Sequence, residues 1–219
     1  MAQNDHSMEA VDSDCEQIDH AVEQWRGMTS FKDLQQLMIK FIKGEIYANP
    51  WHGGPLDDES EVIQPALLAL NETGFISLAG QPGLDAVGDY PNGRFHCQQK
   101  PFIEGLIHKN LLAKVLTDLL TQGYRVHVSG KDTFNMYSNT NMDLSARFWV
   151  TRSAPEGTDD FEEETWFPVF STWILVEVIR EFCTEEFYQV LENEYVVLGV
   201  CSMDIGPGSL EQDLLQAMQ

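Results

Sequence analysis

The chain has 219 residues, of which 43% are hydrophobic, and its 35 aspartates and glutamates against 13 lysines and arginines give a formal net charge of −22. An ordinary basic nucleic-acid binder is excluded, because such proteins need cations to displace counterions from phosphate, and the apolar content excludes a wholly disordered chain. No apolar stretch reaches the roughly 18 residues of a membrane-spanning helix, and the N-terminus lacks the features of a secretory signal. We therefore expect a cytoplasmic protein.

The acidic residues are concentrated towards the two ends of the chain. Residues 1–20 contain six acids and no base, residues 156–219 contain 15 acids and one base, and residues 21–155 contain 14 acids and 12 bases. By subtraction, the two end segments carry net charges of −6 and −14, and the central segment carries −2. A field of this kind is either a solubilising surface or a surface complementary to a basic partner.

Apolar and capping patterns predict the elements of the first half of the chain. Residues 1–20 lack apolar periodicity, which predicts a disordered acidic tail. Ser30 and Asp33 have the spacing of a capping box, so we expect a helix to begin there and to end at Gly44. Beyond it the patterns predict, in order, a helix over about 60–72, a strand over 75–79, a turn-rich loop over 84–93, a strand over 94–107 with Pro101 at an edge or bulge, and a helix over about 109–122.

In the second half, the patterns predict strands separated by polar loops, and one long helix. Strict alternation over 124–128 predicts a strand in which His127 points away from its valine neighbours and towards solvent. The apolar run over 195–203 favours a central strand that is covered on both faces. The remaining elements are a polar loop over 130–142, a strand over 147–151, an acidic loop over 153–165 and a helix from Trp173 to about Glu192.

Together these elements predict an α+β fold. Strands and helices do not alternate regularly, which favours a single two-layer domain in which helices pack on a mixed, mostly antiparallel sheet. We expect this domain to span residues 21–207. The disordered tail of residues 1–20 precedes it, and a C-terminal tail over 208–219 that ends in a helix follows it.

One stretch of the sequence resembles a known family. The residues that carry the likeness are Leu67, Leu70, Asn71, Gly74 and Phe75, then Gln81, Pro82 and Gly83, then Gln99, Lys100 and Gly105, with the Gly54-Pro55 pair before them. Over about 45–105 this pattern resembles a family of small uncharacterised bacterial proteins, in which the position of Ala79 is usually serine and that of Lys100 usually arginine. The resemblance implies a shared fold and supplies no activity.

A polar pocket is the first candidate site. His52 lies in a glycine-rich loop, and Gln81, Gln99, Lys100 and Glu104 lie at or near the ends of two predicted strands. Polar residues at strand ends beside glycine turns are where clefts and binding sites form. The alternative is that the glutamines satisfy backbone groups at turns. The glycine-rich loop lacks the G-x-G-x-x-G and G-K-[ST] patterns, so a phosphate loop is not predicted.

The histidines do not predict a metal site. His96, His108 and His127 are spaced by 12 and 19 residues, whereas metal ligands usually recur at short spacing, and no acid is expected beside them. The sequence also lacks the G-x-S-x-G pattern of a nucleophile elbow. We therefore predict no metal and no cofactor, and the sequence favours a non-enzyme while leaving an enzyme as an open alternative with no assigned catalytic residues.

The leading functional interpretation is a protein-interaction module. Acids spaced along a loop can imitate a phosphate backbone, and a nearby aromatic side chain can anchor a partner. The candidate residues for binding a basic protein partner are Asp159, Asp160, Glu162, Glu163, Glu164 and Trp166. This would be an inhibitor, an immunity protein or a nucleic-acid mimic. The alternatives are an enzyme or small-ligand binder that uses the polar pocket, and a subunit of a larger assembly with Trp149, Trp166 and Trp173 in its interface.

Overall fold

Two antiparallel sheets form the framework of the protein in the computed structural model, which describes residues 17–90, 93–137, 151–158, 162–164, 172–202, 204, 206 and 208–219. The first sheet has the order β1 (Ile76–Gln81), β4 (Phe102–His108), β9 (Tyr195–Cys201), β5 (Arg125–Gly130) and β6 (Thr133–Tyr137). The second has the order β2 (Leu84–Tyr90), β3 (Gly93–Gln99), β7 (Thr151–Pro155) and β8 (Glu162–Glu164). The α+β class is therefore confirmed. Within the described ranges every strand pair is antiparallel, so the expected mixed sheet is not found there.

Strand β9 occupies the centre of the first sheet. It pairs with β4 along one edge and with β5 along the other, and all seven of its residues are buried. An uninterrupted apolar sequence is typical of a strand covered on both faces, because neither face then needs polar residues. The predicted central position of this strand is confirmed.

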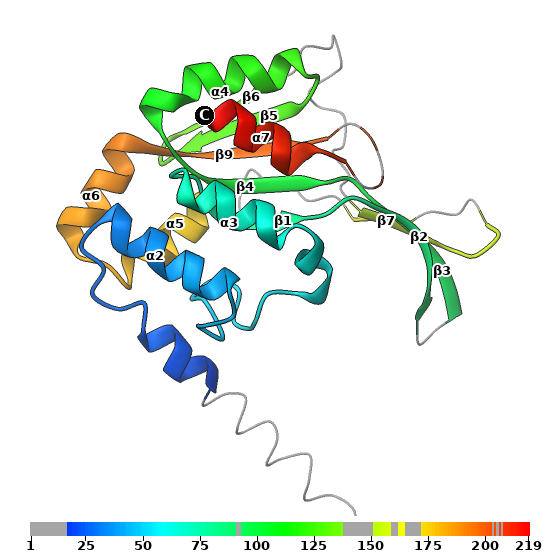
Figure 1. The fold of residues 1–219 in the computed structure, drawn as a ribbon, viewed down its shortest axis with the longest axis horizontal. Helices are drawn as coiled ribbons and strands as arrows, with labels where there is room; N and C mark the ends of the chain where they lie inside the picture. Colours follow the sequence, from blue (N-terminus) through cyan, green and yellow to red (C-terminus); the bar gives the residue numbers. More distant parts are fainter. Residues whose placement is uncertain are drawn as a thin grey trace, which may run out of the picture.

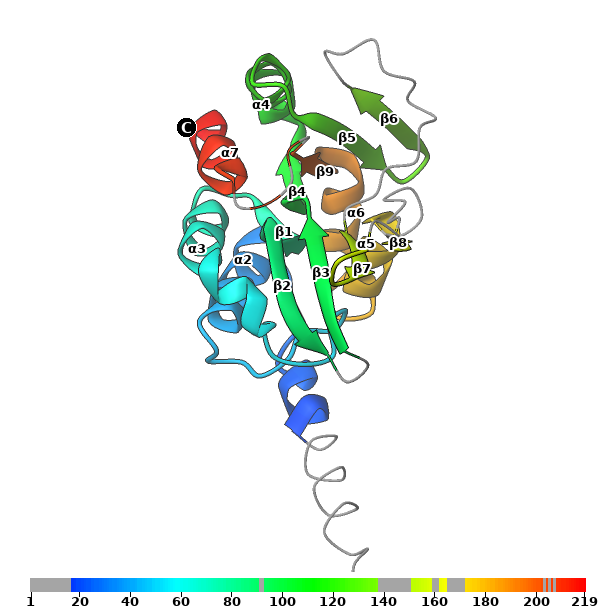
Figure 2. The same cartoon turned by 90° about the vertical axis from the view of Figure 1, so that its right-hand side faces the viewer.

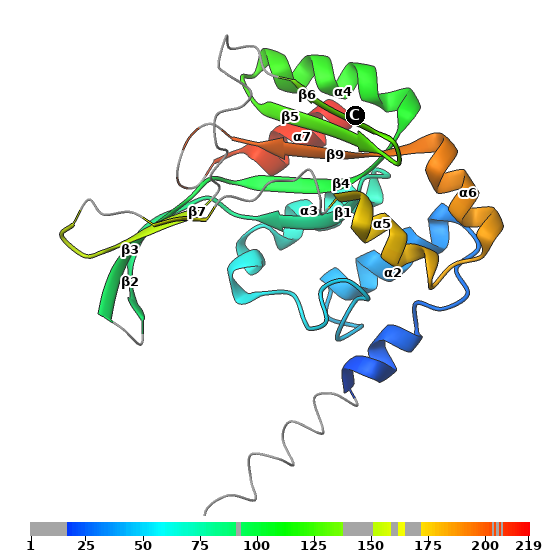
Figure 3. The same cartoon turned by 180° about the vertical axis from the view of Figure 1, so that it is seen from behind.

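The helices lie on both sides of the first sheet. Their bounds are α2 (Phe31–Ile42), the 3₁₀ helix η1 (Asp58–Val62), α3 (Gln64–Glu72), α4 (Lys109–Thr121), α5 (Thr172–Arg180), α6 (Glu185–Glu194) and α7 (Leu210–Met218). Figures 1 and 2 show α2, α3, α7 and α4 side by side over one face. Seen from behind in Figure 3, α5 lies on the opposite face. None of these helices is long and apolar enough to cross a membrane.

The beginning of α2 follows the predicted capping box. The Ser30 hydroxyl accepts a hydrogen bond from the backbone N–H of Asp33, and the Asp33 carboxylate accepts one from the backbone N–H of Thr29. The bonds that the Asp33 carboxylate accepts from the backbone N–H and the hydroxyl of Thr29 lower the pKa of Asp33, because they stabilise its ionised form. Two backbone groups at the helix end that would lack partners are thereby satisfied.

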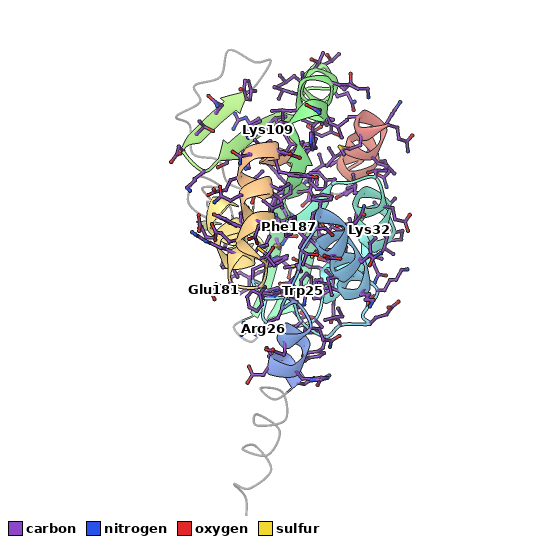
Figure 4. All side chains as sticks on the ribbon, turned by 90° about the vertical axis from the view of Figure 1, so that its left-hand side faces the viewer. Trp25, Arg26, Lys32, Lys109, Glu181 and Phe187 are labelled. Atoms are coloured by element: carbon purple, nitrogen blue, oxygen red, sulfur yellow. The ribbon has the colours of Figure 1, made fainter. Side chains whose placement is uncertain are left out.

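An N-terminal segment packs against the turn between α5 and α6. Residues 17–23 are helical, and the Trp25 indole, which is fully buried, donates a hydrogen bond to the Ala48 carbonyl. Met28 forms a parallel bridge with Cys183, and Figure 4 shows Trp25 on the same side of the molecule as Phe187 of α6. The predicted tail of residues 1–20 is therefore wrong for residues 17–20, and its first 16 residues lie outside the described ranges.

The two sheets are joined by one long, bent hairpin. Strand β1 continues into β2 through Pro82 and Gly83, and β3 continues into β4 through Lys100 and Pro101. Because β1 pairs with β4 and β2 pairs with β3, these four strands form a single ribbon. The part formed by β2 and β3 projects from the body of the molecule (Figure 1). The single strand predicted over 94–107 is therefore two strands, and Pro101 lies at the bend between them.

Three predicted loops contain strands instead. Strand β2 lies in the loop expected over 84–93, β6 in the loop expected over 130–142, and β7 and β8 in the acidic loop expected over 153–165. Strand β2 pairs with β3, β6 pairs with β5, and β8 pairs with β7. These backbone hydrogen bonds outweigh the weak β-propensity of the local sequence. Of the strand expected over 147–151, only Thr151 is described, and it begins β7.

The long helix expected from Trp173 to Glu192 is two helices. Helix α5 ends at Arg180, and α6 begins at Glu185 after Thr184, whose hydroxyl accepts a hydrogen bond from the backbone N–H of Phe187. A threonine followed by acidic residues predicts the start of a helix. The hydroxyl accepts a hydrogen bond from a backbone N–H of the first turn, and the negative charges interact favourably with the positive end of the helix dipole. The helix over 208–219 is α7, whose Leu210 and Leu214 are fully buried.

Gly105 of β4 should tolerate no side chain. A Cβ there would overlap the ring of Phe75 and the Ile76 carbonyl oxygen, whereas a Cβ on Gly54 meets nothing within 4 Å. We expect Gly105→Ala to lower the free energy of unfolding by about 1–3 kcal/mol, as overpacking does in cores, and Gly54→Ala to change it by less than about 0.5 kcal/mol. Urea unfolding of both variants measures this, and equal midpoints would contradict the packing described.

Candidate functional site

A row of polar side chains is buried at the centre of the first sheet. Lys100, Glu104, Arg125 and His127 are exposed to only 9, 5, 9 and 7% of their surface. Such residues are seldom buried unless they are paired or serve a binding or catalytic role. We call these four residues the buried polar row.

The strand register places Glu104, Arg125 and His127 of the buried polar row on one face of the sheet, and Lys100 lies two residues before β4. Glu104 of β4 and His127 of β5 both pair with Gly199 of β9, and Arg125 pairs with Cys201. Alternation along β5 puts Arg125 and His127 on the face opposite Tyr124, whose hydroxyl donates a hydrogen bond to Asp213 of α7. The row therefore faces away from the layer of α7.

Gly199 lets Glu104 and His127 approach each other across β9. A Cβ on Gly199 would overlap the His127 ring, so the ring occupies the space that a side chain of the central strand would take. His127 Nε2 then lies 3.1 Å from Glu104 Oε1. The two residues come from strands that are not hydrogen-bonded to each other, and a glycine between them is what makes the contact possible.

The two cations of the row converge near the end of β9. Burial raises the pKa of the Cys201 thiol to about 12, while Lys100 and Arg125 both act to lower it. Both positive charges are therefore close to this thiol. The Cys201 thiol is held neutral at physiological pH and is not activated as a nucleophile.

The end of the row at the junction of the two sheets is tightly packed. The Gln81 side chain donates a hydrogen bond to the Lys100 carbonyl at 3.1 Å. The backbone N–H of Gly206 donates to the Gln99 carbonyl and that of Ser202 to the Pro101 carbonyl, both at 3.0 Å. Gln81 is therefore held against the segment that carries Gln99 and Lys100, and its bond fits the alternative role of satisfying a backbone group.

His52 lies apart from these four residues. Its Nε2 is 3.4 Å from Asp57, and its ring packs edge-on against Phe41. It lines an open cavity of about 620 Å³ between residues 54 and 59, at the loop that leads into η1. The predicted pocket that combined His52 with Glu104 is therefore not formed.

The prediction of an exposed His127 without an acidic neighbour is wrong. The sequence argument assumed that β5 has one solvent face, but β5 is buried on both, so alternation does not imply exposure. The other two histidines of that group also have acidic partners, Asp85 for His96 and Glu194 for His108. Within the described ranges no three His, Cys, Asp or Glu side chains are grouped to hold a metal.

The acidic candidates for partner binding are only partly described. Asp159, Asp160 and Trp166 lie outside the described residues. The backbone of Glu162, Glu163 and Glu164 forms β8, which pairs with β7 at the edge of the second sheet.

Sequence reasoning missed half of this site. Arg125 and His127 alternate with valines in β5, and that pattern also fits an exposed face. Gly199, in an otherwise apolar strand, is the signal that could have been used, because an isolated glycine in a strand marks a close approach.

The pairing of Glu104 with His127 is measurable. Glu104→Leu and His127→Leu should each cost about 1–3 kcal/mol of unfolding free energy, because each leaves a buried polar group without its partner. The double variant should cost less than the sum, with a coupling of about 0.5–3 kcal/mol. Urea unfolding of the four proteins gives this value.

The exposed pair His52 and Asp57 is the matched control. The corresponding leucine variants should show a coupling below about 0.5 kcal/mol, as exposed ion pairs do. If the losses of unfolding free energy of Glu104→Leu and His127→Leu add up in the double variant, the contact between the two residues does not stabilise the protein.

Comparisons with known proteins find curated relatives, and these include two methylenetetrahydrofolate reductases. The chain is 28% identical over 96 residues to methylenetetrahydrofolate reductase 1 of Schizosaccharomyces pombe, covering 40% of this chain and 16% of that protein. It is 24% identical over 182 residues to methylenetetrahydrofolate reductase 2 of Saccharomyces cerevisiae, covering 80% of this chain and 28% of that protein. The chain thus spans less than a third of the length of either relative. A family model also matches residues 20–135, and the chain belongs to the family described as a domain of unknown function (DUF6919).

Proposed function

We propose that this chain is a small-ligand-binding module and that the ligand binds at the buried polar row. The observation that carries the proposal is the burial of Glu104, Arg125 and His127 on one face of the central strands, with Lys100 buried just before β4. Burial of charged groups costs several kcal/mol each before partners repay it. A sheet that needed only stability would be served as well by apolar side chains at these positions.

The chemistry of the row suits a small polar molecule. Arginine and lysine side chains donate hydrogen bonds and positive charge, and the glutamate accepts hydrogen bonds. His127 can donate or accept, depending on its tautomer. Groups of opposite character, fixed on the strands of one sheet, orient a ligand more precisely than groups on loops.

The curated relatives are compatible with the binding of a small molecule. By their names those proteins are methylenetetrahydrofolate reductases, and the stretch shared with this chain is a minority of each of them. We assign to the shared stretch the binding of a small molecule, and we do not assign the reduction to it.

A ligand screen tests the proposal. A library of small polar metabolites is added to the purified protein and the shift in melting temperature is measured for each compound. We expect at least one compound to raise the melting temperature of the parent protein, because a ligand that binds only the folded state stabilises it. The same compound should have little effect on Glu104→Gln and His127→Gln.

Arg94→Gln is the matched control, because Arg94 is exposed on the projecting ribbon and pairs with Asp89 and Glu156. It should respond to the compound like the parent protein. A screen in which nothing stabilises the parent, or in which the Glu104→Gln variant responds fully, would refute the proposed site.

Charge segregation supports a second candidate function, the binding of a basic protein. Residues 156–219 carry a net charge of −14, whereas the central segment is nearly neutral. Charge concentrated in one segment speeds association with a partner of opposite sign and selects against partners of like sign. The candidate contact residues remain Asp159, Asp160, Glu162, Glu163, Glu164 and Trp166.

Matched charge variants test this second function. One variant converts Asp159, Asp160, Glu162, Glu163 and Glu164 to Asn or Gln; the other converts Glu177, Glu181, Glu185, Glu186 and Glu194 to Gln. Both remove five negative charges, from different places in the acidic segment. If residues 159–164 are the contact, the first variant alone should lose partner recovery in a pull-down at physiological salt. Equal recovery with both variants would exclude a local contact.

A further inference from the structure

We propose that the outward face of α2 binds an acidic segment of a partner protein. This face consists of Lys32, Gln36, Lys40 and Lys43, and we call it the lysine face. It lies outside both the buried polar row and the acidic segment at the C-terminus. The proposal therefore goes beyond the two functions proposed above and depends on neither of them.

The lysine face contains every exposed residue of α2. From Phe31 to the C-cap Lys43, only the four residues of this face are exposed, and none of them is an acid. At 3.6 residues per turn the four positions fall within an arc of about 80° around the helix axis. The opposite side of the helix is buried in the core through Leu34, Met38, Phe41 and Ile42. The three lysines therefore form one continuous strip of positive charge, which begins at Lys32, labelled in Figure 4.

The lysines of this face form no ion pair and no hydrogen bond with any described residue. Every other lysine or arginine that the structure describes as exposed has a partner. Lys109 donates hydrogen bonds to two backbone carbonyls, and the cations that form ion pairs with carboxylates are Arg26, Arg94, Lys114, Lys131 and Arg180. The chain has 35 acids for 13 bases, so a face with three unpaired lysines is unusual for this protein.

The stability of α2 does not account for these lysines. Lys40 and Lys43 lie at the C-terminal end of the helix, where positive charge is favourable, but Lys32 lies in the first turn, where it is unfavourable. Lys40 and Lys43 are also three residues apart, and like charges at this spacing on a helix repel each other. A negatively charged partner would relieve both effects.

The rest of the molecule favours a short acidic protein segment over a nucleic acid or a membrane. The lysine face is about 16 Å long from Lys32 to Lys43, at 1.5 Å per residue. A nucleic acid strand or an anionic bilayer extends further and would lie against other surfaces of a chain whose net charge is −22. An acidic segment of matching length responds mainly to the lysines, because exposed charges are screened over about 8 Å at physiological ionic strength.

One apolar side chain adds to this preference. Ile39 is half-buried, and its helical position places it at the edge of the lysine face, beside Lys32 and Lys43. An apolar side chain of a partner protein gains stability by packing against such a residue, whereas a phosphate backbone does not.

Fluorescence anisotropy with matched peptides tests the proposal on the full chain. The probe is a labelled synthetic helical peptide with glutamate at every fourth residue, and its control has glutamine at the same positions. We expect the glutamate peptide to bind the parent protein and the glutamine peptide not to bind. Replacing Lys32, Lys40 and Lys43 together by Gln should weaken the binding on the order of tenfold, because several weak surface pairs are lost at once.

Two further variants separate this face from charge in general and from folding. Replacing Lys109, Lys114 and Lys131 together by Gln removes as many exposed lysines, each of which already has a partner, and should leave the peptide affinity unchanged. Replacing the three lysines of the lysine face by Arg keeps their charge and should retain the affinity. The Gln variant of the lysine face should melt at the temperature of the parent protein, because it breaks no contact within the chain.

Other occupants of this face would give different results. Self-association of the parent protein that the Gln variant of the lysine face loses would identify a second copy as the occupant. Tighter binding of a single-stranded oligonucleotide or of phosphatidylserine vesicles than of the glutamate peptide, through the same lysines, would identify a nucleic acid or a membrane. Each of these results overturns the proposal. Equal binding of the two peptides, or equal loss of affinity in the two Gln variants, also overturns it.

Discussion

The absence of a side chain at Gly199 is the constraint on which the centre of this protein depends. Gly199 lies in the middle of β9, the strand that joins β4 to β5 and is buried along its full length. The space beside it is filled by the His127 ring, and this lets His127 approach Glu104 from the far side of β9. One missing methyl group therefore converts an apolar sheet centre into a place where two polar side chains meet.

Burying the charged side chains of the buried polar row costs free energy of folding, and the remainder of the sheet offsets this cost. The opposite face of the same strands is apolar, with Val126, Val128, Leu198 and Val200 all buried. These residues gain stability by leaving water, whereas buried charged groups gain little or nothing over apolar residues of similar size. The two faces of the sheet thus differ. The face towards α7 is apolar along β5 and β9, and the other face carries Glu104, Arg125 and His127 beside buried apolar residues such as Leu106 and Val197.

Local sequence patterns were sufficient where they were strong, and they failed where pairing or burial decided the outcome. The capping box at Ser30 and the apolar run of β9 were predicted, because each is determined by a few adjacent residues. Strand β2 was missed because its glycine and aspartates favour turns, and only pairing with β3 makes it a strand. His127 was misplaced because alternation shows which face a side chain is on, but does not show whether that face is covered. The sequence analysis named Gln81, Gln99, Lys100 and Glu104 as candidate site residues, and it did not name Arg125.

The unit that carries the site is longer than the segment that the family model matches. That segment ends at residue 135 and includes all four residues of the buried polar row, but not Gly199 or Cys201. Without β9, strands β4 and β5 would have no common neighbour, because each pairs with β9 and not with the other. Glu104 and His127 would then lose both the strand that fixes their separation and the glycine that admits the ring. The alignment to the Saccharomyces cerevisiae protein covers 182 residues, which is consistent with a shared structural unit that extends well beyond residue 135.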